Sequence, residues 1–221
     1  MSNRDAVTGW TLKTTAPVVL FGLLLLFSLE IGIVSLLKYF TDSMEAPPPV
    51  LGNAFARPFL LVHVVAGVVA LVLVPLQLVP AIRTRWPSLH RANGRIYAVA
   101  CAIAAPAGFM LALGTFAGPV AAVGFAIPAL LWPVFTAIGI RAAITGDFDQ
   151  HRRWMLRSFA ICANAITLRI LLPLAMIAGY EFTPAYRVIA WLGWIINLVA
   201  VELMLRRRGR EPAEAGLLAP A

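Results

Sequence analysis

The sequence predicts an all-α protein, a polytopic bundle of six transmembrane helices with both termini in the cytoplasm. Two features of composition lead to this class: 61% of the 221 residues are hydrophobic and only 13% are charged, whereas a soluble domain carries about 25% charged residues. The third is that the apolar residues gather into stretches of about 20, the length that crosses a bilayer. A soluble enzyme, a disordered chain and a disulfide scaffold are therefore excluded.

Six such stretches are bounded by charged residues or proline: 16–37, 59–80, 96–116, 120–140, 155–178 and 188–205. The first is too long for a cleaved signal peptide and contains Glu30. Gly118 and Pro119 leave room only for a tight turn, so the third and fourth spans should form an antiparallel hairpin. We thus expect a cytoplasmic tail over 1–15, a transmembrane domain over 16–205 and a basic, disordered cytoplasmic tail over 206–221.

Lysine and arginine indicate the orientation, because they accumulate on the cytoplasmic side of membrane proteins. With six spans, fourteen of the eighteen cations lie on the side of the two tails, and three (Lys38, Arg57 and Arg187) lie on the opposite side. The net charge of +8 follows from this asymmetry. It suits anionic lipid headgroups, so the expected partners are membrane lipids and not nucleic acid, and the expected location is the cell inner membrane.

Glu30, His63 and Arg169 lie inside predicted spans, where a charge costs at least ~2.5–3.5 kcal/mol. Glu30 and Arg169 each stand fourteen residues into an outward-running span, so they should share a depth, with His63 nearby. We expect a buried Glu30–Arg169 pair. It is either a polar site for a quinone carbonyl, a proton path or a carried solute, or an ion pair that only docks the first helix on the fifth. His63 alone is more often a hydrogen-bonded core histidine.

A second polar group lies at the cytoplasmic rim, where His90 precedes the third span and His151 the fifth, each followed by arginine. Two imidazoles from different helices at one depth could ligate the iron of one b-type heme, and nearby arginines could neutralise its propionates. The arginines in question are Arg91, Arg95, Arg152 and Arg157. The alternative is that all six are interfacial residues of the kind most membrane proteins carry.

The motifs Leu89-His90-Arg91-x-x-Gly94-Arg95-x-Tyr97 and His151-Arg152-Arg153-Trp154-Met155-x-Arg157-Ser158 resemble a widespread bacterial family of predicted multi-pass membrane proteins of unknown function. The likeness covers about 59–205 and includes a histidine at the position of His63. It implies that His63, His90, His151 and Arg169 act together, without implying a reaction.

A more remote likeness is to six-helix b-type membrane cytochromes and ferric-reductase-like proteins. These carry one histidine on each of four central helices, the third pairing with the fifth and the second with the fourth. His90 and His151 fit the first pair, but the stretch 120–140 has no histidine. The resemblance therefore implies one heme or none.

Three functions follow from the sequence. One is a heme-binding or quinone-linked redox protein; another is an accessory or lipid-binding subunit that joins other membrane subunits. The third is a small proton-coupled carrier that uses Glu30, His63 and Arg169. The sequence leaves open whether the protein is an enzyme.

Overall fold

The computed structural model describes residues 12–40 and 52–217, and all regular elements in this part of the chain are helices. They are α1 (Leu12–Phe40), α3 (Ala56–Leu78), α4 (Pro80–Arg85), α5 (Pro87–Leu113), α6 (Pro119–Ile144), α7 (Phe148–Cys162), α8 (Asn164–Ile177) and α9 (Phe182–Leu217). The predicted all-α class is confirmed. Most of the loop predicted between the first two spans lies outside the described residues.

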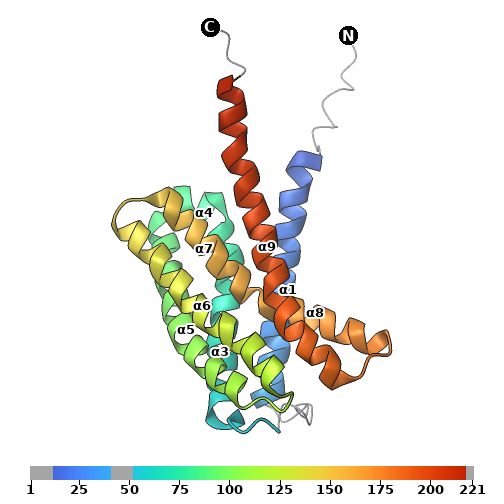
Figure 1. The fold of residues 1–221 in the computed structure, drawn as a ribbon. Helices are drawn as coiled ribbons and strands as arrows, with labels where there is room; N and C mark the ends of the chain where they lie inside the picture. Colours follow the sequence, from blue (N-terminus) through green and yellow to red (C-terminus); the bar gives the residue numbers. More distant parts are fainter. Residues whose placement is uncertain (1–11, 41–51, 218–221) are drawn as a thin grey trace, which may run out of the picture.

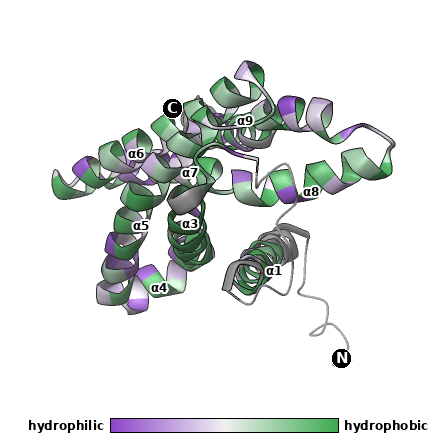
Figure 2. Cartoon of the chain, turned by 90° about the horizontal axis from the view of Figure 1, so that it is seen from below, coloured by the Kyte–Doolittle hydropathy of each residue, from purple (hydrophilic) through white to green (hydrophobic). Residues whose placement is uncertain are grey.

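Five stretches of helix are long and apolar enough to cross a membrane: Phe59–Leu78, Pro87–Leu113, Pro119–Ile144, Phe148–Ile177 and Phe182–Arg207. Hydrophobic residues make up most of the length of the helices (Figure 2), and many large ones are exposed, as expected where the surroundings are lipid. In α1 the apolar helix found among the described residues is shorter, Gly22–Ser35. A sixth span and cytoplasmic termini therefore stay predictions.

The helices α3, α5, α6 and α7 pack side by side, with α1 against α3 and with α9 against α6 and α7 (Figure 1). The predicted hairpin of the third and fourth spans is confirmed, because α5 and α6 are antiparallel neighbours joined by a short turn. At that turn Gly118 has φ of +86°, a conformation that glycine adopts without steric cost. Pro119 follows as the first residue of α6, where a missing N–H costs nothing.

A network of buried side chains joins α5, α6 and α7. The hydroxyls of Tyr97 and Ser158 are 2.6 Å apart, and Trp132 donates its indole N–H to the Tyr97 oxygen at 2.8 Å. Thr136 is 2.8 Å from the Ser158 hydroxyl. Phe159 packs edge-on against the Tyr97 ring, with centroids 5.1 Å apart. Tyr97 and Ser158 are fully buried, so their hydroxyls depend on partners within this network.

The predicted fifth span is interrupted, which corrects the expectation of one continuous helix over 155–178. The helical run begins earlier, at Phe148, because the Asp147 carboxylate accepts a hydrogen bond from the Gln150 N–H at 3.0 Å and caps α7. It breaks at Ala163, whose carbonyl accepts from Ile166 in a tighter, three-residue turn. From there α8 leaves the direction of α7 and runs beside the start of α9 (Figure 1).

Two further boundaries differ from the expected ones. The helix α5 begins at Pro87 and not near residue 96, so His90 lies in its first turn. The helix α9 continues to Leu217, past the point where a disordered tail was expected after residue 205. The residues beyond that point are rich in arginine, glutamate and alanine, which are strong helix formers even where hydropathy has ended.

Candidate functional site

A cavity of about 280 Å³ lies among α1, α3, α5, α6, α8, the end of α7 and the start of α9. It is near the end of the bundle where residues 52–55 meet the α5–α6 turn, since the Ala54 N–H donates to the Gly114 carbonyl at 3.1 Å. Its walls are mostly aliphatic and aromatic side chains. Its polar lining residues are Ser35, Asn53, His63, Thr115, Asn164, Arg169 and Tyr186. The predicted proximity of His63 to Arg169 is therefore seen at one cavity.

His63 enters the cavity from α3, and its ring is held by α5. The ring Nδ1 is 2.9 Å from the carbonyl oxygen of Ala104. Gly108, one turn later on α5, makes room for the ring, because a Cβ there would stand 2.8 Å from both Nδ1 and Cε1. The position of the imidazole thus depends on a glycine that the sequence alone did not single out.

Arg169 reaches the cavity from α8. Its guanidinium donates to the Ser35 hydroxyl of α1 at 3.1 Å and to the Ala165 carbonyl one turn earlier at 3.1 Å. The guanidinium of Arg169 is within electrostatic range of the His63 ring. It therefore provides positive charge and hydrogen-bond donors on the side of the cavity formed by α1 and α8.

Glu30 is not part of this site, which corrects the expected Glu30–Arg169 pair. The two ion pairs between described residues are Arg153–Asp149 and Arg157–Glu202, and Glu30 lies on an exposed face of α1. The helix register explains the difference: Ile31 and Ser35 are on the face of α1 that lines the cavity, and Glu30 is on another. Position along each helix correctly predicted that His63 of α3 and Arg169 of α8 lie near each other. It does not predict towards which side of its helix a side chain points.

Asn164 and Ser35 are lining residues that the sequence reasoning missed. Asn164 is the first residue of α8, directly after the helix break, and its buried Oδ1 has no hydrogen-bond partner in the described part of the chain. It packs against Gly193 of α9, where a Cβ would clash with it. An asparagine inside an otherwise apolar stretch is the signal that could have indicated this position.

The two rim histidines lie where α5 and α7 begin, at the end of the bundle opposite to the cavity (Figure 1). His151 is 2.8 Å through Nδ1 from the Gly139 carbonyl of α6. The Nδ1 of His90 is buried and has no partner among the residues described, and the two imidazoles are within electrostatic range of each other. The structure thus brings His90 and His151 to one region, and neither lines the cavity that contains His63.

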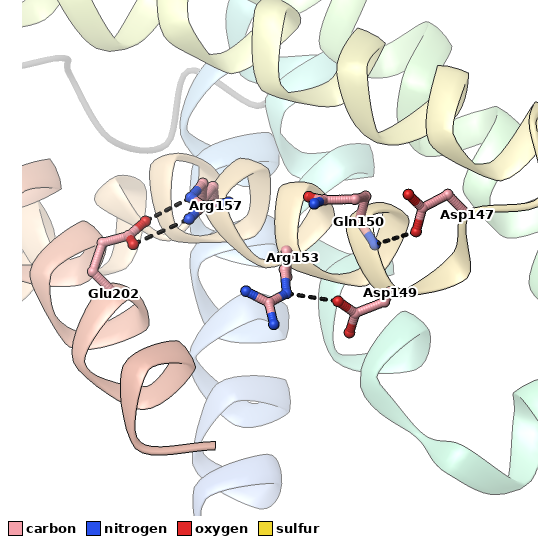
Figure 3. A network of polar contacts seen from close by, with 6 residues as sticks. All are labelled: Asp147, Asp149, Gln150, Arg153, Arg157 and Glu202. Atoms are coloured by element: carbon pink, nitrogen blue, oxygen red, sulfur yellow. Dashed lines mark hydrogen bonds and ion pairs between the residues drawn. The ribbon is translucent and has the colours of Figure 1, made fainter. Parts of the chain in front are cut away.

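The arginines of this rim differ in what they contact. Arg157 binds Glu202 of α9 through two hydrogen bonds, Nε to Oε1 at 2.5 Å and Nη2 to Oε2 at 3.1 Å (Figure 3). Its guanidinium also lies 4.7 Å from the centre of the Trp154 ring. Arg91, Arg95 and Arg152 are exposed. Arg157 is therefore engaged as a contact between α7 and α9, while the other three remain open to an anion.

Among the described residues no group of three or more histidine, cysteine, aspartate or glutamate side chains could hold a metal ion. Cys101 and Cys162 are buried free thiols. The described residues therefore form two candidate binding features: the cavity lined by His63 and Arg169, and the pair of His90 and His151.

Residues 60–205 fit the model of a family described as "Predicted membrane protein (DUF2306)", and the chain belongs to this family. The match confirms the resemblance to a family of predicted membrane proteins and covers every helix from α3 to the membrane-spanning part of α9. Neither a curated protein nor a solved structure matches the chain.

Proposed function

For this member of a predicted membrane protein family, we propose that the protein binds a small lipophilic molecule of the quinone and quinol class in the cavity that His63 and Arg169 line. The single observation that supports this is the cavity itself: His63 from α3 and Arg169 from α8 are among a few polar side chains that line a mostly apolar space. Sites for small molecules commonly combine apolar walls with a few polar groups that fix orientation.

The cavity is large enough to hold the head group of such a molecule. Its volume of about 280 Å³ is near the lower limit of about 300 Å³ for small-molecule sites. One substituted ring with two oxygens would occupy most of that space. A hydrophobic tail would then extend between helices towards the lipid. A polar solute that passes through the bundle would find the mostly aliphatic and aromatic walls less suitable.

Binding is tested with the full chain in lipid nanodiscs, titrated with a short-tailed ubiquinone analogue in oxidised and in reduced form. Trp132 lines the cavity, so a bound ring should quench part of the intrinsic fluorescence. We expect saturable quenching by at least one form, weakened about tenfold or more in His63→Leu and in Arg169→Gln. The matched controls are Val62→Leu, an exposed neighbour on α3, and Arg153→Gln outside the cavity. Absence of saturable binding of both forms would overturn the proposal.

As a second candidate, we propose that His90 and His151 hold one b-type heme, which would supply one-electron transfer. Its support is the hydrogen bond that fixes the His151 ring on the Gly139 carbonyl, a bond typical of ligating histidines. The buried, unpartnered Nδ1 of His90 close by is further support. Arg91, Arg95 and Arg152 could hold the propionates, whereas Arg157 is engaged by Glu202.

The heme is tested by the visible spectrum of the purified protein, oxidised and dithionite-reduced, with a pyridine hemochrome assay for stoichiometry. We expect a reduced α-band at one heme per chain that disappears in His90→Ala and in His151→Ala but stays in His63→Leu. A preparation that is colourless after expression with added heme would overturn this second candidate and leave the first unaffected.

A further inference from the structure

The hydrogen bond of His63 determines which of its ring nitrogens carries the proton. The Ala104 carbonyl oxygen, 2.9 Å from Nδ1, has no proton to give, so Nδ1 must be the donor. In an uncharged imidazole the other nitrogen, Nε2, is then an acceptor only. An apolar cavity favours the uncharged ring over the imidazolium.

The ring cannot easily turn over to move Nδ1 away from the Ala104 carbonyl. It lies against the backbone of Gly108, close enough that an added Cβ would be 2.8 Å from two of its atoms. Turning the ring by 180° about its bond to Cβ would also give up the Ala104 bond, which a half-buried imidazole loses only at a cost. Nδ1 is therefore held as the donor towards α5, and Nε2 is left for other partners.

Nε2 has no hydrogen bond with any residue that the structure describes, and His63 lines the cavity. A ligand group opposite Nε2 must therefore donate a proton to be bound well. A hydroxyl satisfies this requirement, whereas a carbonyl oxygen would place its lone pairs against that of the nitrogen. On the side of the cavity formed by α1 and α8, Arg169 is a donor only, so a ligand oxygen that faces α8 must accept.

We infer that the site selects the hydroxyl-bearing, reduced form of its ligand, a quinol or phenol, over the carbonyl form, and that His63 is the residue that discriminates. This inference rests on the proposed quinone and quinol function. It adds the chemical form of the ligand and the orientation of its two oxygens, with a hydroxyl towards α3 and the other oxygen towards α8.

The first test compares affinities of the full chain in nanodiscs for three probes: a short-tailed ubiquinol, the matching ubiquinone, and the quinol with both hydroxyls methylated. The dimethyl ether keeps the ring but cannot donate. We expect the quinol to bind about tenfold more tightly than either of the others, and this ratio to fall to about one in His63→Phe. The ratio should survive in Val62→Leu, which is the exposed control on the same helix.

The outcomes separate this inference from the proposal on which it rests. If the quinone or the dimethyl ether binds as tightly as the quinol, the selection by His63 is wrong and the binding function stands. If none of the three probes binds, both are wrong. If the ratio persists in His63→Phe, selection exists but another residue is responsible, which overturns the assignment to His63.

A second test needs no ligand and determines directly which ring nitrogen of His63 carries the proton. Nitrogen-15 NMR of protein labelled at its three histidines should show a ring with Nδ1 protonated and Nε2 unprotonated whose signals disappear in His63→Phe. His151, whose Nδ1 is 2.8 Å from the Gly139 carbonyl, should give a similar set of signals that persists in this variant. A His63 ring that carries its proton on Nε2 would overturn the inference even in a protein that binds the quinol.

Discussion

At the scale of single residues, Tyr97 is the centre of the buried network that connects three helices. Its hydroxyl accepts from Trp132 of α6 and shares a hydrogen bond with Ser158 of α7. Both Tyr97 and Ser158 belong to the sequence motifs, which gave them no role. Their contact explains why tyrosine and serine stand at those positions, because each satisfies a polar group in a place without water.

Tyr97→Phe should lower the free energy of unfolding by about 1–3 kcal/mol, because the indole N–H of Trp132 and the Ser158 hydroxyl lose a partner while remaining buried. The change is measured by unfolding in mixed detergent, followed by circular dichroism. Tyr180→Phe, at an exposed position in the α8–α9 turn, is the control and should leave stability unchanged. Equal stability of both variants would show that the network contributes nothing.

The pair Arg157–Glu202 should couple α7 to α9 by about 1 kcal/mol, the upper end for partly exposed ion pairs. Its two hydrogen bonds and side-chain exposures of 20% and 36% favour it over Arg153–Asp149, whose side chains are 41% and 71% exposed. The measurement is a double-mutant cycle with Arg157→Gln and Glu202→Gln. The same cycle on Arg153–Asp149 should give about 0.5 kcal/mol or less. A larger coupling in the control pair would contradict this ranking.

At the scale of elements, glycine allows the close packing of helix pairs. Gly139 of α6 faces Met155 of α7, Gly124 of α6 faces Trp191 of α9, and Gly108 of α5 faces the His63 ring of α3. In each case an added Cβ would come within 3 Å of an atom on the partner helix. Small residues at such interfaces are common in membranes, where packing replaces the hydrophobic effect between helices.

Gly108→Ala should displace the His63 ring and break its bond to Ala104, because the new Cβ would occupy the place of the ring. We expect stability to fall by about 1–3 kcal/mol and quinol affinity to fall with it. Gly22→Ala on α1 is the matched control, since a Cβ there meets nothing within 4 Å and alanine is the better helix former. Unchanged quinol affinity in Gly108→Ala would contradict the described position of His63.

At the scale of the whole molecule, the distribution of positive charge predicts which end faces the cytoplasm. The starts of α5 and α7 and the end of α9 lie at one end of the bundle (Figure 1), and most lysines and arginines gather there. The cavity lies towards the other end. If the charge rule holds, the cavity is in the outer half of the membrane.

Topology is tested by cysteine labelling in intact cells with a reagent that does not cross membranes. Tyr180→Cys should react from outside, and Phe148→Cys should react only after permeabilisation; both positions are exposed, and the two native cysteines are buried. Ser2→Cys should behave like Phe148→Cys if the first predicted span crosses the membrane. If Phe148→Cys is labelled in intact cells, the predicted orientation is wrong. If Ser2→Cys is labelled in intact cells, the first predicted span does not cross the membrane.

The sequence by itself determined the class of the protein: apolar stretches of bilayer length predicted its helices, its membrane character and the α5–α6 hairpin. These follow from composition and period along the chain, which need no knowledge of neighbours. It also predicted that His63 and Arg169 lie near each other, because an ionisable group in an apolar stretch is conspicuous.

Only the tertiary structure decided which of these groups meet. Glu30 does not contact Arg169, Ser35 and Asn164 line the cavity, and Arg157 binds Glu202. The physical reason is that depth in a membrane follows from position along one helix, whereas contact depends on the rotation of that helix and on the small residues of another. Hydropathy along the sequence reports depth in the membrane, but it does not report which side chains are in contact.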